Sequence, residues 1–310
     1  NDTTIKNFGI LSGYSENSTF VDNTISITSG NINVKNVNNN ANVSGLIGSL
    51  NFSTMKNLNM NNDVQIVVDS ANILEINLGH QFGFANNSLI QNVEINANII
   101  VTINAELASA NVGVIAGMSS ASRFNDINIL RTLDGTNVTK GNLKVTGTST
   151  TDNITIGSVV GNDLRGSTLG DGGLVSSMSY IQIDLLTQNL SVGGLIGKSR
   201  NSSSLCSLAS FTGDMNVVNK STGKMVTNGD NEVITYASTN IGGILGESVG
   251  FVVLKNVLSD AQINATISKD ALSILAMGGI IGKTSASSEI INFSVLSIMN
   301  VVGDIVGTSY

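Results

Sequence analysis

The residues of this chain that could carry out chemistry are few. His80 is the only histidine and Cys206 the only cysteine among 310 residues, which leaves no triad with a choice of bases and no His/Cys metal cluster. The nearest approach to a charged cluster is Asp163 with Arg165, and with Asp171 nearby. Cleavage of a polysaccharide needs paired carboxylates at a set separation, whereas the acidic residues here are scattered. We therefore expect a protein that is not an enzyme and that has no cofactor and no metal site.

Two lysines stand where a phosphate-binding loop could be suspected, in Gly197-Lys198-Ser199 and Gly282-Lys283-Thr284. The required spacing of such a loop is absent, so we interpret both segments as turns with a polar exit. His80 lies in a similar glycine-flanked segment and is predicted to be a corner residue, either packed or solvated. Cys206, in Leu205-Cys206-Ser207-Leu208, is predicted to be a core or corner thiol in a position that holds Asn elsewhere.

The elements that would position these residues follow from a repeat. A pair of glycines separated by three residues, mostly aliphatic, recurs along the chain. Its copies begin at residues 9, 44, 79, 113, 157, 193, 242, 278 and 303, and in the looser copy at residue 44 Ser44 takes the place of the first glycine. Consecutive copies are therefore 35, 35, 34, 44, 36, 49, 36 and 25 residues apart. A period near 35 residues is typical of stacked repeat proteins. The two long steps predict insertions near 130–150 and 211–236, and we expect them to project from one face that binds a partner.

A second motif, apolar-x-Asn-apolar, follows the glycine pair after a polar stretch. Glycine suits tight corners because it reaches positive φ, and it also permits close approach of backbones. Asn in the same place of each repeat predicts a ladder of amide hydrogen bonds and tolerates the left-handed conformation. The residues to which we assign these structural roles are Gly193, Gly197, Gly242, Gly246, Gly278, Gly282, Asn57, Asn92, Asn256 and Asn292.

Between these motifs, apolar and polar residues alternate, as in Val93–Ile99, and no helical period is sustained. The chain contains no proline, which paired strands tolerate poorly. The sequence thus predicts an all-β solenoid of about nine repeats of roughly 35 residues. We expect residues 1–310 to form a single elongated array that is part of a longer chain. The aliphatic residues between the glycines should stack in the interior, with at least one of each neighbouring pair pointing inward: Leu195 and Ile196, Ile244 and Leu245, Ile280 and Ile281.

The consensus Gly-Gly-Leu-Ile-Gly, a polar gap and then Ile/Leu-x-Asn-Val resembles the GLUG repeat. The copies at Gly193, Gly242 and Gly278 carry the resemblance best, and weaker copies extend it along the whole chain. GLUG repeats occur in large surface-exposed and secreted proteins, including adhesin-like proteins. The resemblance implies a right-handed β-solenoid and an extracellular or cell-surface location, and it brings no catalytic residues.

Composition excludes some functions. The net charge is −7 and the pI is near 4.6, which argues against a nucleic-acid partner. No apolar run is long enough to span a membrane. Many Asn-x-Ser/Thr sequons are present, as expected by chance in a chain so rich in these residues.

Three functional hypotheses remain open. The first is a structural or adhesive surface protein, a stalk or passenger that binds another protein, a glycan surface or like subunits. The second is a carbohydrate-active β-helix enzyme, which requires carboxylates that converge in a groove. The third is a subunit of an extracellular filament, joined end to end through uncapped terminal repeats.

Overall fold

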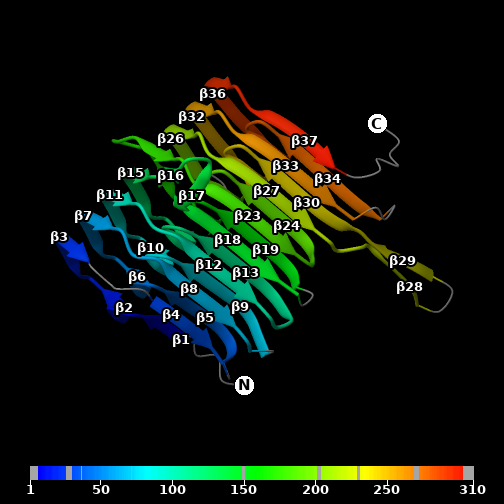
Figure 1. The fold of residues 1–310 in the computed structure, drawn as a ribbon, viewed down its shortest axis with the longest axis horizontal. Coiled ribbons are helices and arrows are strands. Elements are labelled where there is room, and N and C mark those ends of the chain that lie inside the picture. Colours follow the sequence, from blue (N-terminus) through cyan, green and yellow to red (C-terminus); the bar gives the residue numbers. More distant parts are fainter. Residues whose placement is uncertain are drawn as a thin grey trace.

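The computed structural model describes residues 6–25, 30–35, 37–70, 72–148, 151–200, 204–228, 231–268 and 272–302. Within these ranges the chain is built of β-strands and contains no helix. The strands form long parallel sheets in which each strand pairs with its counterpart from the next repeat (Figure 1). The predicted all-β solenoid is confirmed.

One coil of the solenoid consists of four strands that turn at four corners. In the second coil these are β5 (Asn38–Ser44), β6 (Ile47–Asn51), β7 (Thr54–Met60) and β8 (Val64–Val68). The next strand, β9 (Asn72–Gly79), returns to pair in parallel with β5. The four stacks of equivalent strands are called sheets A, B, C and D here, and a corner is named after the two sheets that it joins.

Each sheet collects one strand from every coil, except that one coil contributes two short strands, β21 (Thr168–Leu169) and β22 (Val175–Ser177), to sheet C. Sheet A contains β1 (Lys6–Gly9), β5, β9, β13 (Leu107–Gly113), β19 (Thr151–Gly157), β24 (Thr187–Gly193), β30 (Ala237–Gly242) and β34 (Ser273–Gly278). Sheet B contains β2 (Ser12–Glu16), β6, β10 (Phe82–Asn86), β14 (Ala116–Ser120), β20 (Val160–Asp163), β25 (Ile196–Ser199), β31 (Leu245–Ser248) and β35 (Ile281–Thr284). Sheet C contains β3 (Thr19–Ile25), β7, β11 (Leu89–Ile95), β15 (Arg123–Ile129), β21 (Thr168–Leu169), β22 (Val175–Ser177), β26 (Ser204–Phe211), β32 (Val252–Ser259) and β36 (Ser288–Val295). Sheet D contains β4 (Gly30–Val34), β8, β12 (Ile99–Ile103), β18 (Asn142–Gly147), β23 (Tyr180–Leu185), β27 (Asp214–Asn219), β33 (Gln262–Ile267) and β37 (Ile298–Val302).

The described residues therefore span seven steps of the repeat, from the coil that begins with β1 to the coil that ends with β37. The ninth glycine pair, Gly303 and Gly307, lies outside the described residues.

The core runs through the middle of the inner coils, because equivalent apolar residues stack in register. Ile66 of β8 pairs with Val101 of β12, which pairs with Val145 of β18, and all three are buried. Strands of sheets C and D alternate buried and more exposed positions, as in β8 and β12, whereas β6 and β14 are buried at every position. Sheets C and D thus expose one face, and sheet B is enclosed on both faces over these coils.

The glycine pairs explain how sheets A and B pack so closely. A Cβ atom on Gly246 would lie 2.5 Å from the carbonyl oxygen of Gly197 and 2.6 Å from the backbone nitrogen of Val192, one coil earlier in sheet A. Within the described residues, the first glycine of a pair ends a strand of sheet A, where a Cβ would collide with the carbonyl oxygen three residues ahead, as Gly242 would with Leu245. The same two collisions hold for the other predicted glycines: Gly193, Gly197, Gly278 and Gly282.

The glycines were predicted to act through both positive φ and close backbone approach. Only the second reason applies, because none of these six glycines has positive φ. The aliphatic residues between them lie at the A–B corner and at the start of the sheet B strand, and both members of the first two pairs are buried. In the third pair, Ile280 is buried and Ile281 is partly buried against the core.

Candidate functional site

The predicted asparagines form a column along sheet C. Asn57, Asn92, Asn256 and Asn292 all have left-handed backbone conformation, with φ between 52° and 54°. Asn92 Nδ2 donates to Asn57 Oδ1 over 2.7 Å, and Asn292 Nδ2 donates to Asn256 Oδ1 over 3.2 Å. The ladder predicted from the repeat spacing is therefore present. Asparagine also tolerates the left-handed backbone conformation that each strand adopts at this position.

Cys206 does not occupy a position in this column, contrary to the prediction. Cys206 pairs with Leu254 and its side chain is buried, so it takes the inward apolar position of the motif. The position equivalent to Asn256 belongs to Leu208, two residues later, which has φ of 51°. Burial raises the pKa of the Cys206 thiol to about 12, which makes it a core residue of low reactivity.

Two further ladders were missed in the sequence. In sheet A, Asn77 donates to Asn42 over 2.8 Å and Asn111 donates to Asn77 over 2.7 Å, with all three side chains buried. At the B–C corner, the backbone nitrogen of each serine donates to the hydroxyl of the equivalent serine in the next coil, as Ser53 does to Ser88 over 3.1 Å. Their spacing of about one repeat, at residues 42, 77 and 111 and at residues 53 and 88, was the available signal.

The residues suspected of chemistry have structural surroundings. Asp163 is buried and accepts a hydrogen bond of 3.1 Å from the Ser119 hydroxyl, whereas Arg165 and Asp171 are exposed. Among the described residues, no three His, Cys, Asp or Glu side chains gather where they could hold a metal ion. The same part of the chain has no helix that is long and apolar enough to cross a membrane.

The two lysines of the suspected phosphate loops face a carboxylate. Lys198 Nζ lies 2.8 Å from Glu247 Oε2 and Lys283 Nζ lies 3.8 Å from Glu247 Oε1, because the three residues are neighbours across sheet B. Burial alone would raise the pKa of Glu247, but the hydrogen bond and charge of Lys198, with Ser191 and Lys283, hold it below its ordinary value. This Lys-Glu-Lys row links three coils.

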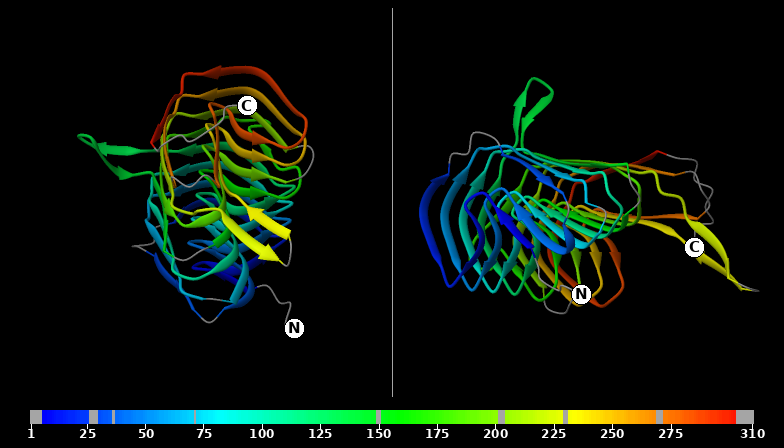
Figure 2. Two further views of the ribbon diagram at one scale, coloured as in Figure 1. Left: turned by 90° about the vertical axis from the view of Figure 1, so that its right-hand side faces the viewer. Right: turned by 90° about the horizontal axis from the view of Figure 1, so that it is seen from below.

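The insertions are two antiparallel hairpins, and they do not share a face. One, β16 (Thr132–Asp134) with β17 (Asn137–Lys140), lies between sheets C and D, and the other, β28 (Lys224–Asn228) with β29 (Asn231–Thr235), lies between sheets D and A. They leave the body at opposite edges of sheet D and project away from it (Figure 2). The predicted limits were too wide, since β18 and β27 are regular strands of sheet D.

The β16–β17 hairpin is braced along the axis of the solenoid by two ion pairs. Arg131 Nη1 lies 2.6 Å from Asp214 Oδ2, and Lys140 Nζ lies 2.7 Å from Asp63 Oδ1. The two aspartates stand in one column at the start of the sheet D strands, two coils to either side of the hairpin. The two ion pairs therefore connect the base of the hairpin to coils on both sides of it along the axis of the solenoid.

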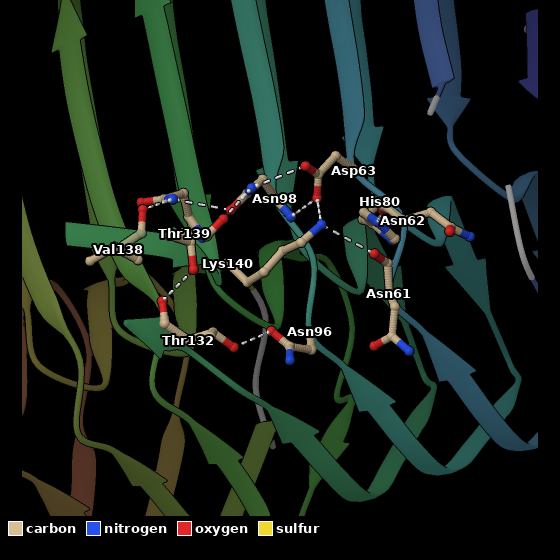
Figure 3. Close-up of polar contacts among 11 residues, drawn as sticks. Asn61, Asn62, Asp63, His80, Asn96, Asn98, Thr132, Val138, Thr139 and Lys140 are labelled. Atoms are coloured by element: carbon tan, nitrogen blue, oxygen red, sulfur yellow. Dashed lines mark hydrogen bonds and ion pairs between the residues drawn. The ribbon is translucent and has the colours of Figure 1, made fainter. Parts of the chain in front are cut away.

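Amide groups between these ion pairs complete the brace (Figure 3). Asn98 Nδ2 donates to Asp63 Oδ2 over 3.2 Å and to the carbonyl oxygen of Thr139 over 2.9 Å. Thr132 Oγ1 donates to Asn96 Oδ1 over 3.1 Å. Burial alone would raise the pKa of Asp63, but the bonds from Lys140 and Asn98 outweigh it and the pKa is lowered. The outcome is a projection fixed at its base, with Leu133 51% exposed.

His80 belongs to the A–B corner, where its side chain is buried, and its ring lies beside Asn62 (Figure 3). Its Nε2 lies 2.6 Å from the carbonyl oxygen of Asn62, and its Nδ1 has no hydrogen-bond partner. Burial lowers the pKa of His80, so the ring is neutral at pH 7. Sequence reasoning left open a packed or solvated corner, and the packed alternative is the one observed.

No known protein family, curated protein or solved structure matches this chain.

Proposed function

We propose that this chain is a structural and adhesive surface protein in which the β-solenoid is a stalk and the β16–β17 hairpin contacts the partner. The braced hairpin is the observation that carries the proposal. A two-stranded hairpin is marginally stable alone, yet this one is held by ion pairs and amide bonds to coils on both sides. Such bracing suits an element that must keep its position on a rigid rod when a partner binds.

The surface of the solenoid supports a structural role. Its regular positions carry amide and hydroxyl ladders, as Asn92 on Asn57 and Asn300 on Asn264 do, in place of clustered charges. Parallel strands in every coil give the rod continuous backbone pairing along its axis. We assign it no catalytic role, since Asp163 and Glu247, the carboxylates that are buried in the described part of the chain, are engaged in contacts between coils.

The setting that we propose is extracellular or at a cell surface. The support comes from the resemblance of the glycine pairs and the Asn motif to GLUG repeats, which occur in secreted and surface-exposed proteins. The net charge of −7 agrees with a protein or glycan partner better than with nucleic acid.

A second candidate is association between like subunits through the ends of the rod. In the first and last described coils, large apolar side chains are exposed, among them Phe8 and Leu11 at one end and Leu296 and Ile298 at the other. Strands β1 and β37 each pair with another strand on one side only within the described part of the chain. Unpaired strand edges of this kind favour addition of further strands.

Binding assays with coated probes test the adhesive proposal. Beads carrying the chain should adhere to at least one of immobilised mucin, collagen, fibrinogen or a glycan array, and Leu133→Ser should reduce adhesion at least about tenfold, as loss of an interface anchor does. Leu74→Ser is the matched control, because Leu74 is also an exposed leucine, 60% accessible, but lies in sheet A away from the hairpin. No adhesion to any probe, or equal losses in both variants, would contradict the proposal.

Sedimentation velocity tests the second candidate. Association through the ends should give a weight-average mass that rises with concentration, and Ile298→Lys should abolish the rise by placing a charge on the exposed edge. A single species of 32.1 kDa at all concentrations would exclude association by this chain alone.

A further inference from the structure

The loop between β7 and β8, residues Asn61 to Asp63, is held from two sides. From inside the solenoid, the ring of His80 contacts the carbonyl oxygen of Asn62 over 2.6 Å. From outside, Lys140 of the hairpin donates to the carbonyl oxygen of Asn61 over 3.3 Å and to Asp63 Oδ1 over 2.7 Å. Figure 3 shows that His80 and Lys140 both lie next to this loop. The hairpin and the buried histidine therefore depend on the same three residues.

The contacts of His80 define its protonation state. A carbonyl oxygen can only accept, so Nε2 carries the hydrogen and donates it to Asn62. Nδ1 is then an acceptor, and no donor in the described structure reaches it. Neutral imidazole thus satisfies the one hydrogen bond that the site offers and leaves one nitrogen without a partner.

Protonation would add an N–H group at Nδ1 and a positive charge, both buried without an acceptor. A buried charge that is not paired is costly, and the site relieves that cost by admitting water or a counter-ion. The charged groups that act on His80 are Asp63 of the loop, which attracts a cation, and Lys140 of β17, which repels one. The nearest counter-ion is Asp63, which would turn toward the ring and away from Lys140. If the ring instead moved out to water, it would displace the loop at Asn62, and with it the adjoining Asp63.

We propose that protonation of His80 releases the loop Asn61–Asp63 and thereby detaches the β16–β17 hairpin from its Lys140 anchor, so that the adhesive element is fixed near neutral pH and mobile in mild acid. This inference rests on the proposed role of the hairpin for its biological meaning, but the release itself does not depend on a partner.

The position of His80 in the repeat supports a local role. The equivalent corner residue in neighbouring coils is Gly45, Val114 or Ser158, none of which can titrate. Histidine occurs at this corner in one coil, and its ring contacts the loop to which the hairpin is anchored.

Two titrations are separated on the pH scale. Burial lowers the pKa of His80 below its ordinary 6.5, so the open form binds the proton more strongly and opening is favoured once the pH falls below about 6.5. The pKa of Asp63 lies below its ordinary 3.8, so its ion pair with Lys140 persists until the pH falls below that value. Between pH 6.5 and 4.5, release of the hairpin would therefore result from protonation of His80 and not from protonation of Asp63. One proton permits at most a tenfold change in the ratio of open to closed forms per pH unit.

A spin label at Thr136→Cys, on the tip of the hairpin, measures the release directly. Cys206 is buried, so the label attaches at the tip alone. The ratio of mobile to immobile spectral components should rise up to about tenfold per pH unit from pH 6.5 to 4.5 in the otherwise native chain. His80→Gln, which can still donate to Asn62 but does not titrate, should remain immobile throughout, and Asp63→Asn should be mobile at every pH.

Controls separate the release from unfolding and from the binding role. A label at Asn59→Cys on sheet C should stay unchanged over the same range, and His80→Val, which copies Val114, repeats the test if the Gln variant does not fold. The inference would be overturned if the label stayed immobile in the native chain down to pH 4.5. It would also be overturned if the His80→Gln and His80→Val variants released the hairpin as much as the native chain does. Since no partner is present, that failure would leave the adhesive proposal standing, and failure of adhesion would leave the release untouched.

Discussion

Leu208 and Asn256 are equivalent residues of adjacent coils in sheet C, and both have left-handed backbone conformation, with φ of 51° and 53°. The same conformation recurs at Asn57, Asn92 and Asn292. For Leu the left-handed region costs about 1–2 kcal/mol, whereas Asn tolerates it. The fold therefore imposes one backbone shape on the column and accepts the strain where the sequence departs from Asn.

Replacing Leu208 with Asn should stabilise the protein by about 1 kcal/mol. The strain would be relieved, and Asn256 Nδ2 could donate to the new side chain as Asn292 does to Asn256. Leu208 is substantially exposed, so little burial is lost. Urea unfolding measures the change. Leu74→Asn, at an exposed leucine in an ordinary strand, should not stabilise, and a gain there as large as at Leu208 would contradict this explanation.

Replacing Gly246 with Ala should destabilise the protein by about 1–3 kcal/mol, as overpacking does. The added Cβ would meet backbone atoms of Gly197 and Val192, which cannot move without separating sheets A and B. Gly30→Ala is the matched control, because its Cβ would meet side chains and no backbone atom: the end of Ile10 closely, and Val64 at an ordinary contact distance. Thermal unfolding of both variants is the measurement, and equal shifts would show that backbone approach is not the cause.

The Lys-Glu-Lys row predicts a pH-dependent effect. The pKa of Glu247 lies below its ordinary 4.5, so its ion pairs contribute stability that is complete above pH 4.5 and is lost as the pH falls through the lower, folded-state value. Glu247→Gln should therefore be less stable than the native chain at pH 7, by on the order of 1 kcal/mol for partly exposed pairs. The difference should shrink in urea titrations at pH 3. A constant difference across this range would refute the assignment.

The Cys206 thiol should resist alkylation in the folded protein. Its pKa of about 12 and its burial leave almost no accessible thiolate at pH 8. Iodoacetamide at pH 8 should modify it at least a hundredfold faster in 6 M guanidinium chloride, as read by mass spectrometry. Similar rates in the two conditions would mean that the thiol opens readily to solvent.

Much of the architecture was predictable because the same sequence motifs recur along the chain. Glycine pairs near every 35 residues, the alternation of apolar and polar residues and the absence of proline each indicate stacked strands. The Asn ladder follows from the same spacing, and it is present at Asn57 and Asn92. The prediction for Cys206 was wrong because its coil is irregular. There, the pairing of Cys206 with Leu254, and not the sequence motif, fixes which residues are equivalent.

The candidate site was only partly predictable. The step lengths located the insertion that became the β16–β17 hairpin, but they gave no sign that Lys140 meets Asp63 or that Arg131 meets Asp214. Those partners are separated by 77 and 83 residues, and neither pair belongs to the repeat motif. Contacts across two coils depend on where each corner lies around the rod.

By itself, the sequence determined the fold class, the stacking period and the residues of the Asn column, because a one-dimensional repeat forces each coil to bury its apolar face against the next. Only the tertiary structure decided why the glycines are needed, how the hairpin is fixed and which loop His80 supports. Those outcomes depend on the approach of sheets A and B and on the alignment of coils that are far apart in the chain. Register along the axis, set by backbone pairing, brings Lys140 and the ring of His80 to the same loop, Asn61 to Asp63.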